Sequence, residues 1–128
     1  MKITIKLERA ADAYEALVKL SREKLTYRTA HAMMLLKKEL HKEAEFLQDE
    51  ELKIAKEHAV LNEEGEIQWI GDGKFQIREG MQKQYRKAMQ ELLETEVSIE
   101  QMKAAIPPEN ITLEQMEALD GLLIFEEG

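Results

Sequence analysis

The chain has 128 residues, 44% hydrophobic and 34% charged, which suits one domain with a modest core and long solvated helix faces. It contains no cysteine, which excludes a disulfide framework, thiolate zinc sites and cysteine nucleophiles. No apolar segment approaches the roughly 20 residues that a membrane-spanning helix needs, and the N-terminus has no apolar signal region. We therefore expect a soluble cytoplasmic protein that does not contact a membrane.

The net charge of -8 is concentrated in the last third of the chain. Residues 1–90 contain 17 Lys and Arg against 16 Asp and Glu, whereas residues 91–128 contain 1 Lys and 10 Asp and Glu. This asymmetry disfavours direct binding of nucleic acid, because phosphates would be repelled. It favours a protein partner with a basic surface, although an acidic face kept only for solubility explains the same bias.

A strand and a short helix are expected first. Ile3, Ile5 and Leu7 alternate with polar residues, which predicts a half-buried strand. The next residues predict an amphipathic helix. Its apolar face is expected to contain Ala10, Ala11, Tyr14, Leu17 and Val18, with Arg9, Asp12, Glu15 and Lys19 mostly off it.

A long helix is expected from Tyr27 to about Leu61, because this segment has neither Pro nor Gly and Thr26 is a suitable N-cap. Apolar residues recur every seven positions at Met33, Leu40, Leu47, Ile54 and Leu61. The companion heptad positions are Ala30, Lys37, Ala44, Glu51 and His58. A strict dimeric coiled coil needs both positions apolar, so this seam favours a helix packed on another helix.

The middle of the chain predicts a β-hairpin followed by a returning helix. Gly65 is expected to end the long helix, and Gly71-Asp72-Gly73 separates two short apolar stretches. A helix beginning near residue 81 then packs antiparallel on the long helix through Met81, Tyr85, Ala88, Met89, Leu92 and Leu93. Val97 and Ile99 predict a strand beside the N-terminal one.

The C-terminal part predicts a break, a short helix and an apolar tail. Pro107-Pro108 interrupts the chain, and Thr112 with Gln115 forms a capping box for a helix that ends near Asp120-Gly121. The fold class is therefore mainly α with minor β (α+β). We expect a single elongated domain over residues 1–128: a long antiparallel helical hairpin, a small β-hairpin at its tip, and a short two-stranded sheet plus C-terminal helix at the other end.

The sequence contains no catalytic constellation, and we expect that the protein is not an enzyme. Gly71-Asp72-Gly73 lacks the spacing of a phosphate-binding loop, and neither Ser21 nor Ser98 lies in a nucleophile turn. His41 and Glu45 share a helix face, but no second pair completes a metal site. His58 is expected to be a partly buried, hydrogen-bonded histidine. No metal or cofactor is predicted.

Two regions are candidates for binding a partner protein. The first is the acidic C-terminal region, with Glu114 and Glu117, the apolar tail Leu122, Leu123, Ile124 and Phe125, and the terminal Glu126 and Glu127. In the alternative, this tail docks on the protein's own core. The second is the β-hairpin with Trp69 and Phe75, which either packs on the helices locally or forms an exposed recognition tip.

The layout resembles a poorly characterised family of small proteins, a domain of unknown function, encoded by tailed phages of Gram-positive bacteria. The resemblance covers most of the chain. It lies in Lys2–Leu7, the long charged helix, Asn62–Ile67, Glu91–Ile99 and Leu113–Leu123. It implies a phage origin, and with it the host cell cytoplasm, and it transfers no active site.

The function expected from these observations is that of a phage-encoded protein-binding module. It would act as a steric inhibitor of a host defence protein through its acidic C-terminal surface. The alternative is a structural or assembly accessory protein of the phage particle, such as a tail accessory protein or a chaperone. The signature of that alternative would be stoichiometric presence in purified particles, or self-assembly into a homo-oligomer through the imperfect heptad seam.

Overall fold

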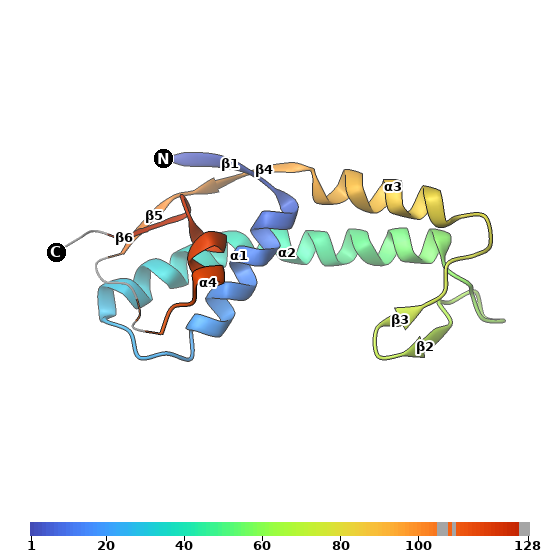
Figure 1. The fold of residues 1–128 in the computed structure, drawn as a ribbon, viewed down its shortest axis with the longest axis horizontal. Helices are drawn as coiled ribbons and strands as arrows, with labels where there is room; N and C mark the ends of the chain where they lie inside the picture. The colour runs from blue at the N-terminus through green and yellow to red at the C-terminus, as the bar shows by residue number, and fades with distance from the viewer. Residues whose placement is uncertain (105–107, 109, 126–128) are drawn as a thin grey trace. The chain divides into compact units, whose positions relative to one another are not determined.

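The computed structural model describes residues 1–104, 108 and 110–125. The protein is 54% helical with small strand pairs, which confirms the predicted α+β class with helices dominant. Figure 1 shows the elements in chain order. They are β1 (Lys2–Lys6), α1 (Leu7–Leu20), α2 (Tyr27–His58), β2 (Trp69–Gly71), β3 (Lys74–Phe75), α3 (Gln82–Leu93), β4 (Glu96–Glu100), β5 (Met102–Ala104), α4 (Leu113–Leu119) and β6 (Leu123–Phe125).

The chain divides into two compact units, each described by itself below. The first, here called the terminal unit, contains Met1–Glu45 and Glu96–Gly128, and the second, the middle unit, contains Phe46–Thr95. Helix α2 contributes its first part to the terminal unit and its second part to the middle unit. The prediction of a single domain stays a prediction.

Two strand pairs bring the ends of the chain together in the terminal unit. The predicted pairing of the N-terminal strand is confirmed, because β1 is antiparallel to β4 with Ile3 opposite Ile99. Directly after β4, strand β5 pairs with β6 in parallel, with Met102 opposite Leu123. The backbone N–H of Gln101 donates to the carbonyl of Met1, so the two pairs are connected at this point.

Helix α1 is confirmed, but the prediction of its buried face is partly wrong. The residues buried in α1 are Leu7, Ala10, Ala13, Ala16, Leu17 and Leu20. Ala11, Tyr14 and Val18, which were expected on the apolar face, are only partly buried. The small residues Ala13 and Ala16 allow neighbouring elements to approach α1 closely, and this selects their side of the helix for the core.

The first part of α2 packs on this core and begins as predicted. The hydroxyl of Thr26 accepts a hydrogen bond from the N–H of Thr29 at 3.4 Å, so Thr26 caps the helix. Met33 and Leu40 of the predicted seam are buried, but Leu36, which the seven-residue repeat omits, is fully buried too. A straight helix has 3.6 residues per turn, so its buried face includes positions that a strict heptad leaves out.

The long helix ends at His58, three residues before the predicted end at Leu61. Extended backbone follows, with isolated β-bridges from Ala59 to Ile77 and from Leu61 to Ile67. Gly65 lies in a turn farther along, with a φ of 80°, and does not end the helix. The prediction failed because backbone pairing with both arms of the following hairpin replaces the last helical hydrogen bonds.

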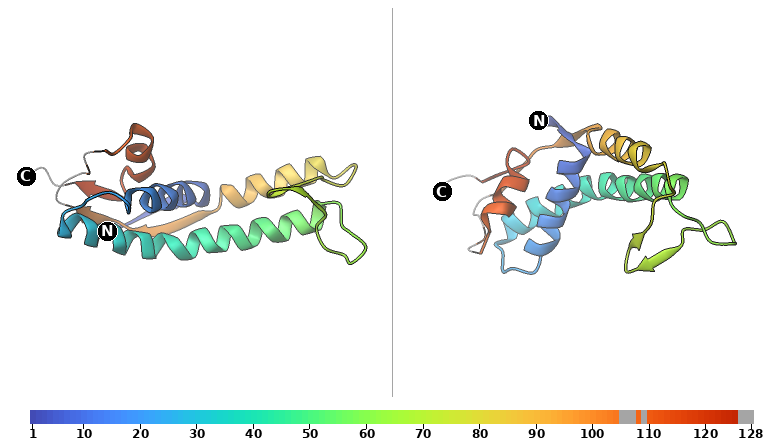
Figure 2. Two further views of the ribbon diagram at one scale, coloured as in Figure 1. Left: turned by 90° about the horizontal axis from the view of Figure 1, so that it is seen from below. Right: turned by 45° about the vertical axis from the view of Figure 1, so that its right-hand side comes forward.

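The β-hairpin and the returning helix of the middle unit are confirmed. Strands β2 and β3 pair antiparallel with Trp69 opposite Phe75, and Gly73 in the turn has a φ of 68°. Helix α3 runs back beside the second part of α2 (Figures 1 and 2). The ring of Tyr85 on α3 lies edge-on to that of His58 on α2, with 5.9 Å between the ring centroids. Ala55, Ala59 and Ile67 form the small buried cluster of this unit.

Helix α4 closes the terminal unit, and its capping box is confirmed. The hydroxyl of Thr112 accepts from the N–H of Gln115 at 3.1 Å, and the side-chain oxygen of Gln115 accepts from the N–H of Thr112 at 2.9 Å. After Gly121, at a φ of 77°, the tail turns back into the core. The predicted break at Pro107-Pro108 lies partly outside the described residues.

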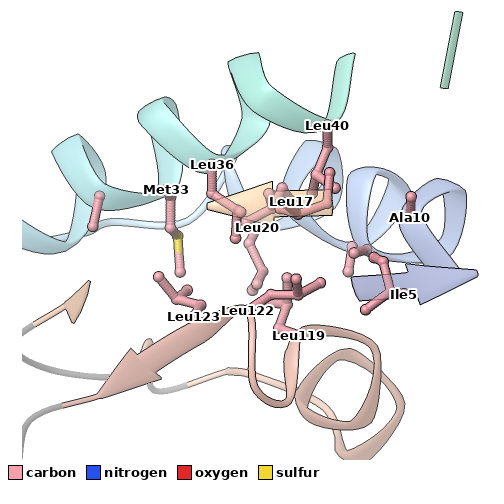
Figure 3. Packing of buried hydrophobic residues seen from close by; sticks show 14 residues of the cluster. Ile5, Ala10, Leu17, Leu20, Met33, Leu36, Leu40, Leu119, Leu122 and Leu123 are labelled. Carbon is pink, nitrogen blue, oxygen red and sulfur yellow. The ribbon is translucent and has the colours of Figure 1, made fainter. Parts of the chain in front are cut away.

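Figure 3 shows the core of the terminal unit. Leu17 and Leu20 of α1 lie between Leu36 and Leu40 of α2 on one side and the C-terminal segment on the other. Leu119, Leu122 and Leu123 supply that third layer. Two consecutive helices and a segment near the C-terminal end of the described chain therefore share one core, and α4 packs against α1.

Candidate protein-binding surfaces

The terminal unit has a groove of about 560 Å³ between α1 and α4, here called the acidic groove. It is lined by Arg9, Asp12, Glu15, Ala16 and Lys19 of α1 and by Thr112, Glu114, Gln115, Glu117 and Ala118 of α4 and its cap. Apart from Ala16, these α1 residues are the polar ones that the helical pattern placed off the apolar face. Helix α4 packs beside that polar face, and the groove lies between the two helices.

The basic side chains of the acidic groove already have partners within the protein. The guanidinium of Arg9 donates to the backbone carbonyl of Asp120, and the ammonium of Lys19 is 3.3 Å from a carboxylate oxygen of Glu15. No ion pair within the described ranges involves Asp12, Glu114 or Glu117. The lining therefore has an excess of negative charge that the protein itself does not neutralise.

The effect of the neighbouring carboxylates on one another is evident at Asp12, which lines the groove. Partial burial, and then the negative charges of Glu8, Glu15 and Glu114, raise the pKa of Asp12 above its ordinary value of 3.8. A carboxylate repelled by its neighbours in this way binds an added cation more favourably than an isolated one. The groove is thus suited to Lys or Arg side chains of a partner.

The structure divides the predicted C-terminal binding residues into two groups. Glu114 and Glu117 are exposed and line the acidic groove. Leu122 is 0% exposed and Leu123 is also buried, both in the core, which corrects their assignment to a partner-binding surface. Phe125 is partly buried against the same core, and Ile124 is 36% exposed. Glu126 and Glu127 lie outside the described residues.

The tail was assigned to a partner because its apolar residues are followed by charge. The structure gives the reason for its burial: β6 adds to β5, and this pairing places Leu123 opposite Met102. The alternative that the tail docks on the protein's own core is the correct one for Leu122 and Leu123.

The hairpin residues Trp69 and Phe75 belong to the middle unit. Trp69 is 51% exposed, and its ring is edge-on to that of Phe75 with centroids 5.7 Å apart. Phe75 is also edge-on to Tyr85 at 6.1 Å, so it is a local packing residue. Phe75 thus packs locally, as the first alternative states, while Trp69 and Ile70 are largely exposed and a recognition role for them stays a prediction.

The described histidines make local hydrogen bonds and ring contacts. Nδ1 of His58 lies 2.7 Å from the carbonyl of Ile54, and its side chain is buried, as predicted for a hydrogen-bonded histidine. His41 contacts the hydroxyl of Tyr14 at 3.1 Å and a carboxylate oxygen of Glu45 at 3.7 Å. In the described part of the chain, no three His, Cys, Asp or Glu residues are placed to hold a metal ion.

Sequence reasoning missed the α1 wall of the acidic groove. Arg9, Asp12, Glu15 and Lys19 were recognised as a polar face, but nothing in their spacing indicates that α4 packs beside them.

In the described residues, each helix is too short or too polar to cross a bilayer. Comparisons with protein-family models, with curated proteins and with solved structures gave no match.

Proposed function

We propose that the protein is a protein-binding module whose acidic groove accepts a basic segment of a partner protein. The observation that carries the proposal is the composition of the groove: four carboxylates line it, while its two cations are engaged within the protein. A volume of about 560 Å³ accommodates a few side chains, such as the Lys and Arg of one exposed loop or helix turn. Opposite charge would also accelerate association and make it sensitive to salt.

The resemblance to phage proteins suggests the biological setting of this binding. A phage-encoded module that covers a basic functional surface of a host protein inhibits it sterically, without any chemistry of its own. The proposed partner is therefore a host defence protein whose basic residues are needed for its action. The α1–α4 groove replaces the apolar tail as the proposed contact, since Leu122 and Leu123 are buried.

A phage structural or assembly accessory protein is the second candidate. It is favoured by large apolar side chains that stay exposed on α2 in the middle unit, Phe46 and Leu52. Stoichiometric presence of the protein in purified phage particles would support this candidate and weaken the inhibitor proposal.

The experiment compares three tagged proteins as baits in a host lysate. They are the wild type, the groove variant Glu114→Gln/Glu117→Gln and the control variant Glu63→Gln/Glu64→Gln. The control removes the same charge from an exposed turn in the middle unit. We expect the wild type and the control to retain one host protein at low salt and to lose it as salt rises, and the groove variant to retain much less. Equal retention by all three baits would contradict the proposal.

A further inference from the structure

A second charged surface of the terminal unit has the opposite sign. It is a shallow hollow of about 190 Å³, here called the basic surface, lined by Tyr27, Arg28, His31, Ala32, Leu35, Met102 and Lys103. Its described lining contains no carboxylate, and no ion pair in the described ranges uses Arg28 or Lys103. A basic surface whose two cations have no ion pair among the described residues is unexpected in a chain with a net charge of -8.

The basic surface also exposes apolar area. The side chain of Tyr27 is 82% exposed, and that of Leu35 is exposed as well. The rings of Tyr27 and His31 are stacked, with centroids 6.0 Å apart and an angle of 8° between their planes. This stack gives a flat aromatic face beside Arg28, and aromatic residues and Arg are both enriched in protein interfaces.

The outer face of α4, beside the acidic groove, has the complementary character. Leu113 is 71% exposed and Met116 is 52% exposed. Helical spacing places Glu117 on the same side as these two residues, one turn or less away, and Glu114 adjoins Leu113. One surface of the terminal unit thus combines exposed apolar side chains with carboxylates, and another combines them with cations.

From this complementarity we infer that the partner of the basic surface is the α4 face of a second copy of the chain. Tyr27 and Leu35 cover Leu113 and Met116 of the second copy, while Arg28 and Lys103 meet Glu114 and Glu117. Both surfaces belong to one compact unit, so each copy presents them together. Two unlike surfaces that meet in this way form a closed dimer if both contacts form at once, and a ring or a chain otherwise.

The inferred self-association and the proposed function use the same two carboxylates, Glu114 and Glu117. Only in this respect does the inference rest on the proposed function. A basic partner and a second copy would compete for these carboxylates, so self-association regulates access to the acidic groove. At low concentration, where the chains separate, the groove is open to the partner. The basic surface takes no part in partner binding, and variants on that side distinguish the two ideas.

Sedimentation velocity and light scattering test the inference on the full chain, at about 50 mM and about 500 mM salt, where the screening length differs severalfold. We expect the wild type to exceed the monomer mass at low salt and to approach it at high salt. Arg28→Glu and Glu117→Arg should each be monomeric at low salt. The controls Arg86→Glu and Glu63→Arg, which reverse charges in the middle unit, should associate like the wild type.

The mixture of the two charge-reversed variants is the decisive sample. Arg28→Glu places a carboxylate opposite Glu117, and Glu117→Arg places a guanidinium opposite Arg28, so each variant repels itself at this pair, whereas the mixture restores opposite charges at the pair and should form a complex containing both. Tyr27→Ala, which keeps all charges, should weaken association at least tenfold. If the reversed variants do not fold by circular dichroism, this variant decides alone.

The inference is overturned if the wild type is a monomer at every concentration, or if it associates and these variants associate equally well. The inference is also overturned if variants of the basic surface lose binding to an acidic host protein or to a nucleic acid and keep self-association. The basic surface would then belong to that other ligand. Arg28→Glu keeps its groove intact and should still capture the basic partner. A wild type that stays monomeric but captures the basic partner through Glu114 and Glu117 refutes only the self-association, whereas a wild type that self-associates but captures no basic partner refutes only the proposed function.

Discussion

The burial of Leu122 leads to a strong prediction about stability. Leu122 was a candidate for partner binding, but the structure places it in the core with Leu119 and Leu123. Its side chain is 0% exposed and belongs to the same core cluster as residues of α1 and α2 (Figure 3). We therefore expect Leu122→Ala to destabilise the whole terminal unit without a direct effect on a binding surface.

The magnitude follows from the buried area and the cavity that the substitution creates. Full burial of a leucine side chain contributes about 2 to 3 kcal/mol, at roughly 25 cal/mol per Å² of apolar surface. An unfilled cavity adds to this loss, so Leu122→Ala should cost about 3 to 5 kcal/mol. A domain of this size has a total stability of about 5 to 15 kcal/mol, so a large part would be lost.

The assay is urea unfolding followed by circular dichroism, with Leu113→Ala as the matched control. Leu113 is 71% exposed on α4, so the same chemical change there should cost less than about 0.5 kcal/mol. The reasoning would be refuted if Leu122→Ala were as stable as the control. It would also be refuted if Leu122→Ala reduced partner binding at full stability, because Leu122 would then act at the surface.

Three further predictions concern the cap of α4, the charge of the acidic groove and the middle unit. Thr112→Ala removes the capping box and should cost about 1 kcal/mol in urea unfolding, whereas Thr112→Ser should cost much less; equal stability of all three proteins would exclude a role for the cap. The pKa of Asp12 is raised in the folded protein, so its ionisation opposes folding: the associated stability is present below pH 3.8 and is lost as pH rises through the raised pKa. Asp12→Asn should therefore be more stable than the wild type at pH 7 and equal to it in acid, and a thermal-melting series that shows a less stable variant at pH 7 would disprove this assignment. Ile67→Ala, in the buried cluster of the middle unit, should destabilise by about 2 kcal/mol or more, and Ile70→Ala, on the exposed hairpin, by less than about 0.5 kcal/mol; hydrogen exchange of α3 amides should detect the first change and not the second.

The elements with local signals were predictable from the sequence. The alternation of Ile3 and Ile5 predicted β1, the glycines around Asp72 predicted the hairpin, and the spacing of Thr112 and Gln115 predicted the cap of α4. Each of these signals acts over a few residues, through backbone geometry or one side-chain hydrogen bond. They do not depend on what the rest of the chain does.

The elements whose structure depends on distant contacts were predicted less well. Helix α2 contacts different neighbours along its length, so its buried face includes Leu36, which a single repeat could not indicate. The helix stops at His58 because residues 59–61 pair with both arms of the hairpin, and no local breaker indicates this. Likewise, the charge next to the tail suggested exposure, whereas pairing of β6 with β5 decides its burial.

The candidate site was predictable only on its α4 side. The excess of acidic residues after residue 90 indicated Glu114 and Glu117, which line the groove. Asp12 and Glu15 lie about 100 residues earlier in the sequence, and only the packing of α4 against α1 brings them close. A composition argument finds a charged segment, but the depth and the opposite wall of a groove come from tertiary structure.

The central claim is that the acidic groove is the contact for a basic partner. The most direct measurement is a titration of the ¹⁵N-labelled protein with a synthetic Arg-rich peptide, followed by amide chemical shifts at low salt. We predict that the shifts concentrate at residues 9–19 and 112–118, weaken at high salt and are much smaller in Glu114→Gln/Glu117→Gln. Shifts centred on the hairpin, reported by the indole N–H of Trp69, or shifts spread evenly over all acidic segments, would contradict the account.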